Sequence, residues 1–266
     1  MSANSISLIR RDGGGWWMGL GNMLAKELSS WWRTRRWWVQ CLAAVALLNG
    51  TMALNMKGGN LSGAAMNFLF TSALFVPLAA ISLAQDTILG ERHSGTAAWV
   101  FTKPLRRPAF IVAKVIAHGW GLLLAWVLLP VAIAYFQIGK ATGDYPDAVG
   151  FVKAMGLMYL NLFFYFTLAL MLATLFNSRG PVLGIGALLA LGGPLGFIAQ
   201  PINQNASWLM DIMPWILTFP VGDKNPLVGY VANGQPLPTL VPIIATVLWC
   251  VLFTAVAIWR MSREEF

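Results

Sequence analysis

Six long apolar runs dominate the sequence and restrict its fold more than any other feature. They cover residues 37–56, 65–84, 115–138, 152–176, 181–199 and 239–259. Each is close to the roughly 20 residues that an α-helix needs to cross a hydrocarbon core of about 30 Å. The chain has 58% hydrophobic and 11% charged residues, whereas about 25% of a soluble domain is charged. The sequence therefore predicts an all-α polytopic membrane protein, with six transmembrane helices in a single domain over residues 1–266.

The basic residues are distributed unevenly around these runs. If the N-terminus is inside, fourteen of the 18 Lys and Arg residues fall in inner segments, with six of the ten Asp and Glu residues. The inner face then carries the whole net charge of +8. Because cytoplasmic segments are enriched in Lys and Arg, we expect both termini in the cytoplasm. Membrane orientation explains the charge, and no nucleic-acid partner is expected.

Residues 16–36 form a basic, tryptophan-rich stretch before the first run. On a helix, apolar residues such as Trp17 and Trp31 share one face, and Lys26 and Arg33 lie on the opposite face. This pattern predicts an amphipathic helix in the headgroup plane of the membrane. The alternative is that the stretch extends the first transmembrane helix.

The fifth run and the segment after it are unusual. Residues 181–199 contain five glycines and Pro194, and Gly192 and Gly196 stand four positions apart. Small residues at this spacing allow helices to approach closely, at a dimer interface or transport path or in ordinary packing within one subunit. Residues 200–238 hold an apolar stretch that is too short to cross and is broken by Pro214 and Pro220. This composition predicts an interfacial or re-entrant cap outside the membrane.

Residues 85–114 lie between the second and third runs and hold five of the Lys and Arg residues. In order, the segment contains an acidic residue, a glycine, a short apolar helical patch at 97–101, a Lys-Pro turn and a basic cluster. This order predicts a structured cytoplasmic segment that a partner could grip.

The same residues give the chain its resemblance to a known family. The segment resembles the signature of type-2 ATP-binding-cassette (ABC) exporter permeases, and the basic helix before the first run is similar to the entry helix of that family. The residues that carry the resemblance, and that it implies couple to an ATPase, are Glu91, Gly95, Thr96, Lys103, Pro104, Arg107 and Lys114, together with Lys26, Glu27 and Arg33.

The resemblance implies a permease subunit of the bacterial inner membrane that works with a second permease chain and a separate cytoplasmic ATPase. ATP and Mg would then be bound by the ATPase, and this chain would bind no cofactor and would not be an enzyme. The sequence agrees, because it has no G-x-x-x-x-G-K-[ST] motif to hold ATP phosphates. The sequence does not indicate which substrate is transported. A membrane scaffold or assembly factor, for example one that supports metalloenzyme maturation, remains an alternative.

Polar residues in or beside the runs bear on a second alternative, an ion-coupled secondary transporter. Such a protein should have carboxylates within its spans, but all ten Asp and Glu residues lie outside the apolar runs. Asn67, Gln85 and Asn161 are candidates to face a transport path, a dimer interface or a neighbouring helix. His118 is expected to hydrogen-bond a neighbouring helix or to relay protons. The spacing of the Cys and His residues predicts no metal site.

Overall fold

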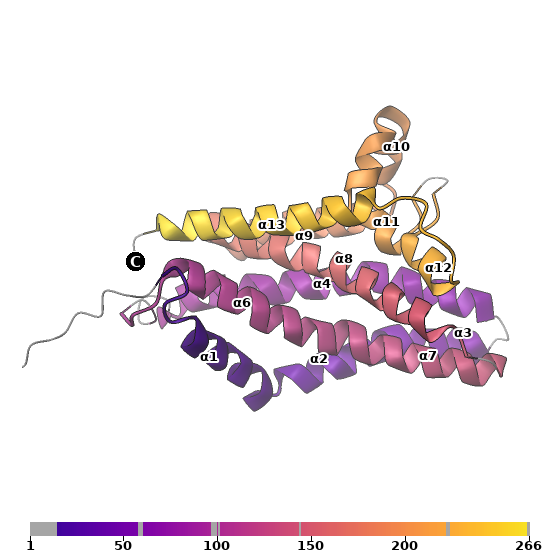
Figure 1. Cartoon of the computed structure of the whole chain (residues 1–266), viewed down its shortest axis with the longest axis horizontal. Helices are drawn as coiled ribbons and strands as arrows, with labels where there is room; N and C mark the ends of the chain where they lie inside the picture. The colour runs from indigo at the N-terminus through magenta and orange to yellow at the C-terminus, as the bar shows by residue number, and fades with distance from the viewer. Residues whose placement is uncertain are drawn as a thin grey trace, which may run out of the picture.

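The computed structural model of the chain describes residues 15–57, 61–96, 100, 102–143, 145–221 and 224–264, and these form an elongated bundle of helices (Figure 1). The elements are α1 (Leu20–Arg33), α2 (Arg36–Ala44), η1 (Val45–Asn49), α3 (Gly50–Lys57), α4 (Leu61–His93), α6 (Arg107–Leu122), η2 (Leu123–Leu128), α7 (Leu129–Thr142), α8 (Ala148–Leu175), α9 (Arg179–Gly192), α10 (Ala199–Asn205), η3 (Ser207–Ile212), α11 (Trp215–Thr218), α12 (Leu227–Ala232) and α13 (Val241–Ser262).

Five helical stretches among the described residues are long and apolar enough to cross a membrane. They are Trp37–Met56, Asn67–His93, Arg107–Thr142, Ala148–Leu175 and Val241–Ser262. The first and the third each contain a π-helical segment, η1 and η2 respectively. The predicted all-helical, polytopic fold is thereby confirmed, and the number of six spans is not.

Two helices extend into the predicted segment of residues 85–114. α4 continues beyond residue 84 to His93, and α6 already begins at Arg107. No proline interrupts residues 85–93, and Gly90 is accommodated within the helix. Gln85 is buried on α4. The connection between the two helices is therefore residues 94–106, and Glu91 and Lys114 both lie on helices. Residues 97–99 and 101 of the predicted apolar patch lie outside the described residues.

The predicted helix over residues 181–199 is shorter than expected. α9 ends at Gly192, and its 14 residues correspond to about 21 Å of helix. The Gly192-Gly193-Pro194 sequence ends the helix, since glycine is flexible and proline removes a donor. Gly196 then adopts a left-handed φ of 80°.

Helix α8 lies at the centre of the bundle, where it packs against α4 and α13. It is apolar on all sides, as expected for a helix surrounded by others. Leu162, Phe166 and Leu170 on this helix are fully buried. The core of the protein therefore forms around α8.

One end of the bundle, here called the cap end, carries α10, η3, α11 and α12 (Figure 1). The cap is residues 193–240, and α10 projects from the bundle. Trp215 donates a hydrogen bond of 2.8 Å to the Leu189 carbonyl of α9, and Trp249 of α13 donates one of 3.2 Å to the Ile212 carbonyl. The cap is therefore held against the bundle. Its re-entrant nature stays a prediction.

The opposite end, called the basic end, gathers α1, the start of α6 and the last turns of α4, α8 and α13. Arg92 of α4 contacts both the last turn of α8 and Glu264 beyond α13. These helix ends, which lie far apart in the sequence, thus meet at one place.

Candidate functional site

Four charged side chains from three helices form a cluster at the basic end. Lys26 and Glu27 lie on α1, Glu91 lies in the last turn of α4, and Lys114 lies on α6. The Lys26 Nζ is 2.9 Å from Glu91 Oε1, and the Lys114 Nζ is 3.2 Å from one oxygen of each of the two glutamates. Lys26 also contacts Glu27, because the Lys26 Nζ lies 3.5 Å from Glu27 Oε1. Both lysines therefore contact both glutamates. We call these four residues the charged cluster; it joins α1, α4 and α6.

Burial makes the cluster sensitive to the loss of Lys114 or Glu27. The Lys114 side chain is 1% exposed and that of Glu27 is 7% exposed. The Lys114 Nζ also lies 4.8 Å from the centre of the Phe110 ring, a cation–π contact. Removing one partner of a buried pair leaves an uncompensated charge, which typically costs about 3–5 kcal/mol. The cluster therefore fixes how the three helices meet.

His118 and Trp31 complete the cluster on the side of α6 that faces α1. The Trp31 indole N–H donates to His118 Nδ1 at 3.1 Å, and His118 Nε2 lies 3.2 Å from Glu27 Oε2. The predicted contact of His118 with a neighbouring helix is confirmed. Burial alone would raise the pKa of Glu27, but the hydrogen bond from His118 and the charges of Lys114 and Lys26 lower it to about 2. Glu27 is therefore an anion over the physiological pH range.

Lys26 is the exposed member of the cluster, with 47% of its side chain accessible. Partial burial lowers its pKa, but the hydrogen bond and the charge of Glu91 have the opposite effect, and together with Glu27 they raise the pKa above its ordinary value. Lys26 thus stays a cation and presents part of its side chain at the surface beside the 94–106 connection.

Two arginines tie the same region to α8 and α13. Arg92 donates hydrogen bonds to the carbonyls of Ala173, Thr174 and Phe176 and, at 2.6 Å, to the Glu264 carboxylate. Arg107 donates to the carbonyls of Met261 and Ser262 at 3.2 and 2.9 Å. The last carbonyls of a helix have no partner within the helix and carry partial negative charge. The two arginines therefore cap the ends of α8 and α13.

The 94–106 connection is shaped by a glycine and a proline. Gly95 has a φ of 70°, which non-glycine residues rarely adopt, and a Cβ there would meet nothing within 4 Å. Thr96 donates a hydrogen bond of 3.3 Å to the Glu91 carbonyl. At the other end, Pro104 lies against Gly19, which has no room for a Cβ. The connection therefore folds back onto the segment before α1.

A shallow groove separates the connection from α1. Its volume is about 320 Å³, and it is lined by Gly19, Asn22, Met23, Lys26, Val100, Lys103, Pro104 and Leu105. Lys26 and Lys103 are both exposed at its rim. The groove therefore presents two lysine side chains beside apolar residues.

The structure brings together most of the residues that the resemblance assigned to coupling. Glu91, Lys114, Lys26 and Glu27 touch one another, whereas Arg33 is exposed at the last turn of α1. Gly95, Thr96, Lys103 and Pro104 lie in the connection, and Arg107 binds α13. Of the described residues, no group of three or more His, Cys, Asp and Glu side chains could hold a metal ion.

The residues predicted to line a path or dimer interface lie apart from this site. Asn161 donates a hydrogen bond of 3.1 Å to Thr218 of the cap, and Gln85 is buried on α4. The Asn67 Oδ1 is buried without a hydrogen-bond partner among the described residues. Gly192 packs against Ile198, and because α9 ends there, Gly192 and Gly196 do not share a helix face. Their role in a path or interface stays a prediction.

Sequence reasoning missed three residues of the site: Trp31, Arg92 and Glu264. The sequence did hold a signal for Arg92, because it directly follows Glu91 and is a basic residue at the end of a long apolar helix. Trp31 was assigned to the apolar face of α1, but its indole N–H needs a partner when buried, and His118 provides one.

These observations define a class: a polytopic α-helical membrane subunit with a buried charged cluster and helix-capping arginines at one end. The comparison with protein families makes the class specific, because residues 22–266 match the family described as ABC-2 family transporter protein. The chain belongs to this family and is the membrane permease subunit of an ABC transporter. As such it is a multi-pass membrane protein, and the predicted family resemblance is confirmed.

Two curated relatives agree with this assignment. The chain is 28% identical over 262 residues to a protein of Stutzerimonas stutzeri named probable ABC transporter permease protein NosY, covering 89% of this chain and 93% of the relative. It is also 28% identical over 256 residues to the protein of the same name from Pseudomonas aeruginosa, covering 88% of this chain and 90% of the relative.

Proposed function

We propose that two permease chains form the path of an ATP-driven exporter and that each chain binds a separate cytoplasmic ATPase at its basic end. The ATPase would bind ATP and Mg, and this chain would bind no cofactor. Family membership supports an ATPase partner. One observation carries the docking position: side chains flanking the 94–106 connection are tied to α1, α6, α8 and α13 at once.

Through these ties, movement of an ATPase bound at the connection would reach the whole bundle. Glu91 passes it to α1 and α6 through Lys26 and Lys114. Arg92 and Arg107 pass it to the ends of α8 and α13. Because these side chains are buried or paired, the helices would respond as a unit, as in the rocking of transporters between inward-open and outward-open states. Glu91 is turned inward in this proposal and positions the connection for the ATPase.

The orientation of the chain follows from the charges at the basic end. We infer that this end, with both termini, is cytoplasmic, because Lys and Arg gather there. α8 ends at the basic end and α13 begins at the cap end, so the chain must pass between them once more. In this proposal α9, together with the turn that follows it, makes the sixth crossing. The apolar residues exposed on α9, Leu183, Ile185 and Leu188, are available to a second permease chain near the pair axis.

Co-expression with a candidate ABC ATPase subunit, followed by native mass spectrometry, tests the assembly. We expect a complex of two permease chains and two ATPase subunits. Lys103→Glu in the groove should weaken ATPase binding roughly three- to tenfold, because a charge at an interface rim is reversed. Lys140→Glu, an exposed lysine near the cap end, is the matched control and should have no effect.

The Glu91→Ala variant tests coupling in the same complex. The protein should still insert, while ATP hydrolysis becomes independent of transport. Wild-type coupling in Glu91→Ala would argue against the proposed role of the cluster. A stable monomer that neither binds the ATPase nor stimulates its hydrolysis would favour the alternative of a membrane scaffold or assembly factor.

A further inference from the structure

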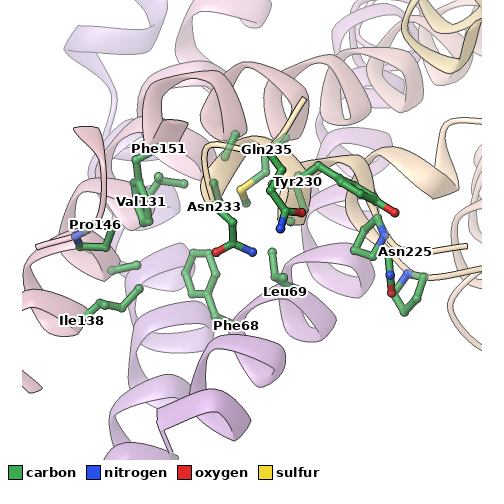
Figure 2. Close-up of a pocket in the computed structure, with 18 of the residues that line it drawn as sticks. Phe68, Leu69, Val131, Ile138, Pro146, Phe151, Asn225, Tyr230, Asn233 and Gln235 are labelled. Atoms are coloured by element: carbon green, nitrogen blue, oxygen red, sulfur yellow. The ribbon is translucent and has the colours of Figure 1, made fainter. Parts of the chain in front are cut away.

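A large cavity lies at the cap end within a single chain, away from the charged cluster. Its volume is about 630 Å³, within the range of about 300–1,000 Å³ that is typical of small-molecule sites. It is bounded by α3, α4, α7 and α8 on one side and by the cap, chiefly α12, on the other (Figure 2). The coupling mechanism proposed above does not use this cavity.

The wall formed by the spans is apolar. It includes Phe68 and Leu69 of α4, Val131 and Ile138 of α7 and Met158 of α8. Among the described residues that line the cavity, none carries a charge. A ligand with an ionised group would therefore bury that charge without a partner, which is strongly unfavourable.

The wall formed by the cap is polar but neutral. Asn225, Tyr230, Asn233 and Gln235 line it, and the two asparagines and the glutamine are exposed, so this side is the mouth of the cavity (Figure 2). No hydrogen bond joins these four side chains to any other part of the described structure. Amide and phenol groups can donate to and accept from ester and amide groups. The mouth therefore suits an uncharged group that forms hydrogen bonds.

Aromatic rings beside the cavity indicate its depth in the membrane. Phe151 lines the cavity and packs against Tyr135, with ring centres 5.2 Å apart. Tyr145 and Phe136 extend this group of rings and are exposed. Exposed Tyr and other aromatic residues gather at the level of the lipid headgroups. The mouth thus lies near the level of lipid ester groups, and the apolar wall continues toward the hydrocarbon region.

We propose that this cavity binds one acyl chain that is esterified or amidated, with the chain against α4, α7 and α8 and its ester or amide group against the amides of the cap. An apolar space beside a bilayer is open to the most abundant apolar molecule there, which is lipid. Because lipid tails already lie in an apolar medium, close packing and the polar mouth must supply the preference for the site. The acyl chain can belong to a membrane lipid or to an acylated protein.

Photocrosslinking of the full chain in nanodiscs tests this proposal. The probe is phosphatidylglycerol with a diazirine on one acyl chain, and the crosslinked peptides are mapped by mass spectrometry. We expect crosslinks on the apolar wall, at peptides containing Phe68 and Met158. Gly229→Leu should lower this labelling about tenfold, the ratio expected for a loss of about 1.4 kcal/mol, because Gly229 lines the cavity and a Cβ there would have its nearest neighbour 3.9 Å away.

A matched variant and two further probes make the test decisive. Gly184→Leu places the same side chain on α9, where a Cβ meets nothing within 4 Å, and should leave the labelling unchanged. A free fatty acid with the same diazirine should label the cavity about tenfold less, because its carboxylate meets no cation among the described lining residues. A diazirine-bearing acylated peptide that labels the cavity more strongly than the phospholipid would identify an acylated protein as the source of the chain.

Two results would overturn the proposal. One is labelling confined to the membrane-facing surfaces of α9 and α13 and equal in wild type and Gly229→Leu, which would indicate ordinary surrounding lipid. The other is equal labelling by the ester and the free acid, which would contradict an uncharged site. Ala154→Phe fills the cavity at a second position in its wall. It therefore shows whether a result for Gly229→Leu reflects the cavity or a local distortion at residue 229.

Discussion

The indole N–H of Trp31 donates a hydrogen bond of 3.1 Å to Nδ1 of His118, 87 positions later in the chain. Nδ1 accepts this bond through its lone pair, which leaves Nε2 to carry the ring proton. Nε2 then donates to Glu27, 3.2 Å away. One tryptophan thus sets the orientation of the histidine and, through it, the attachment of α1 to α6.

A substitution at Gly121 of α6 tests this attachment. The Trp31 ring lies directly on Gly121, and a Cβ there would overlap it. Gly121→Ala should therefore displace the ring, break its bond to His118 and cost about 1–3 kcal/mol. The midpoint of thermal unfolding in detergent and hydrogen exchange of α1 measure the effect. Gly156→Ala is the control, since its Cβ meets nothing within 4 Å; equal behaviour of the two variants would contradict the prediction.

Glu27 should make the stability of the protein depend on pH. Its folded-state pKa of about 2 lies below its ordinary value of 4.5, because the hydrogen bond from His118 and the nearby lysines outweigh burial. A depressed carboxyl pKa stabilises the folded state fully above pH 4.5, and this contribution is lost as the pH falls toward 2. The loss should be roughly 3 kcal/mol for the wild type.

Glu27→Gln should show a flatter stability profile between about pH 4.5 and pH 2, because the amide does not titrate there. It should also be less stable than the wild type at neutral pH. Asp86→Asn is the control: the Asp86–Arg179 pair is exposed, and such pairs contribute at most about 1 kcal/mol. If Glu27→Gln and the wild type lose stability in parallel as the pH falls, the assigned role of Glu27 is wrong.

Hydropathy predicted the helical spans well because a bilayer demands long apolar helices. It failed at their ends, where side-chain pairing decides how far a helix continues. Gln85 and Glu91 marked a polar segment in the sequence, yet both lie on α4, where Glu91 forms ion pairs with Lys26 and Lys114. The length of α9 was overestimated because the apolar composition continues past Gly192, whereas the helical backbone ends there.

The candidate site was predicted in part, because charged residues next to spans stand out in a sequence. Which of them meet was not predictable, since pairs such as Arg92 and Glu264 are 172 positions apart. Glu27 was assigned to the polar entry helix and is buried instead. The cavity had no signal at all, because its apolar lining residues look like any other part of a span.

Gly95 offers a test of backbone conformation without a change in packing. Its φ is 70° and a Cβ there has open space. Gly95→Ala should therefore lower the free energy of unfolding by about 1–2 kcal/mol, the cost of the left-handed backbone conformation alone. ATPase coupling should fall with it if the connection is the docking element. Gly90→Ala is the matched control on α4, where a Cβ also meets nothing, and it should be neutral or slightly stabilising. Equal stability of both variants would show that the φ at Gly95 imposes no constraint.

The last prediction separates the two arginines at the basic end. Arg92 reaches the final carbonyls of α8 and also Glu264, whereas the carbonyls that Arg107 reaches belong to α13. Arg92→Lys keeps the charge but loses the fork that serves several oxygens at once. We therefore expect Arg92→Lys to lose about 1–3 kcal/mol of stability, with faster hydrogen exchange both in the last turn of α8 and around residue 264.

Arg107→Lys should speed exchange at the end of α13 alone and leave the last turn of α8 protected. Hydrogen exchange followed by mass spectrometry resolves the two regions, because peptides covering residues 168–178 and 256–264 do not overlap. If Arg107→Lys also loosens the last turn of α8, or if Arg92→Lys leaves that turn protected, the proposal that each arginine links the connection to its own helix fails. If neither changes exchange, the helix ends are held by apolar packing, and movement of the connection would not reach α8 and α13 by this route.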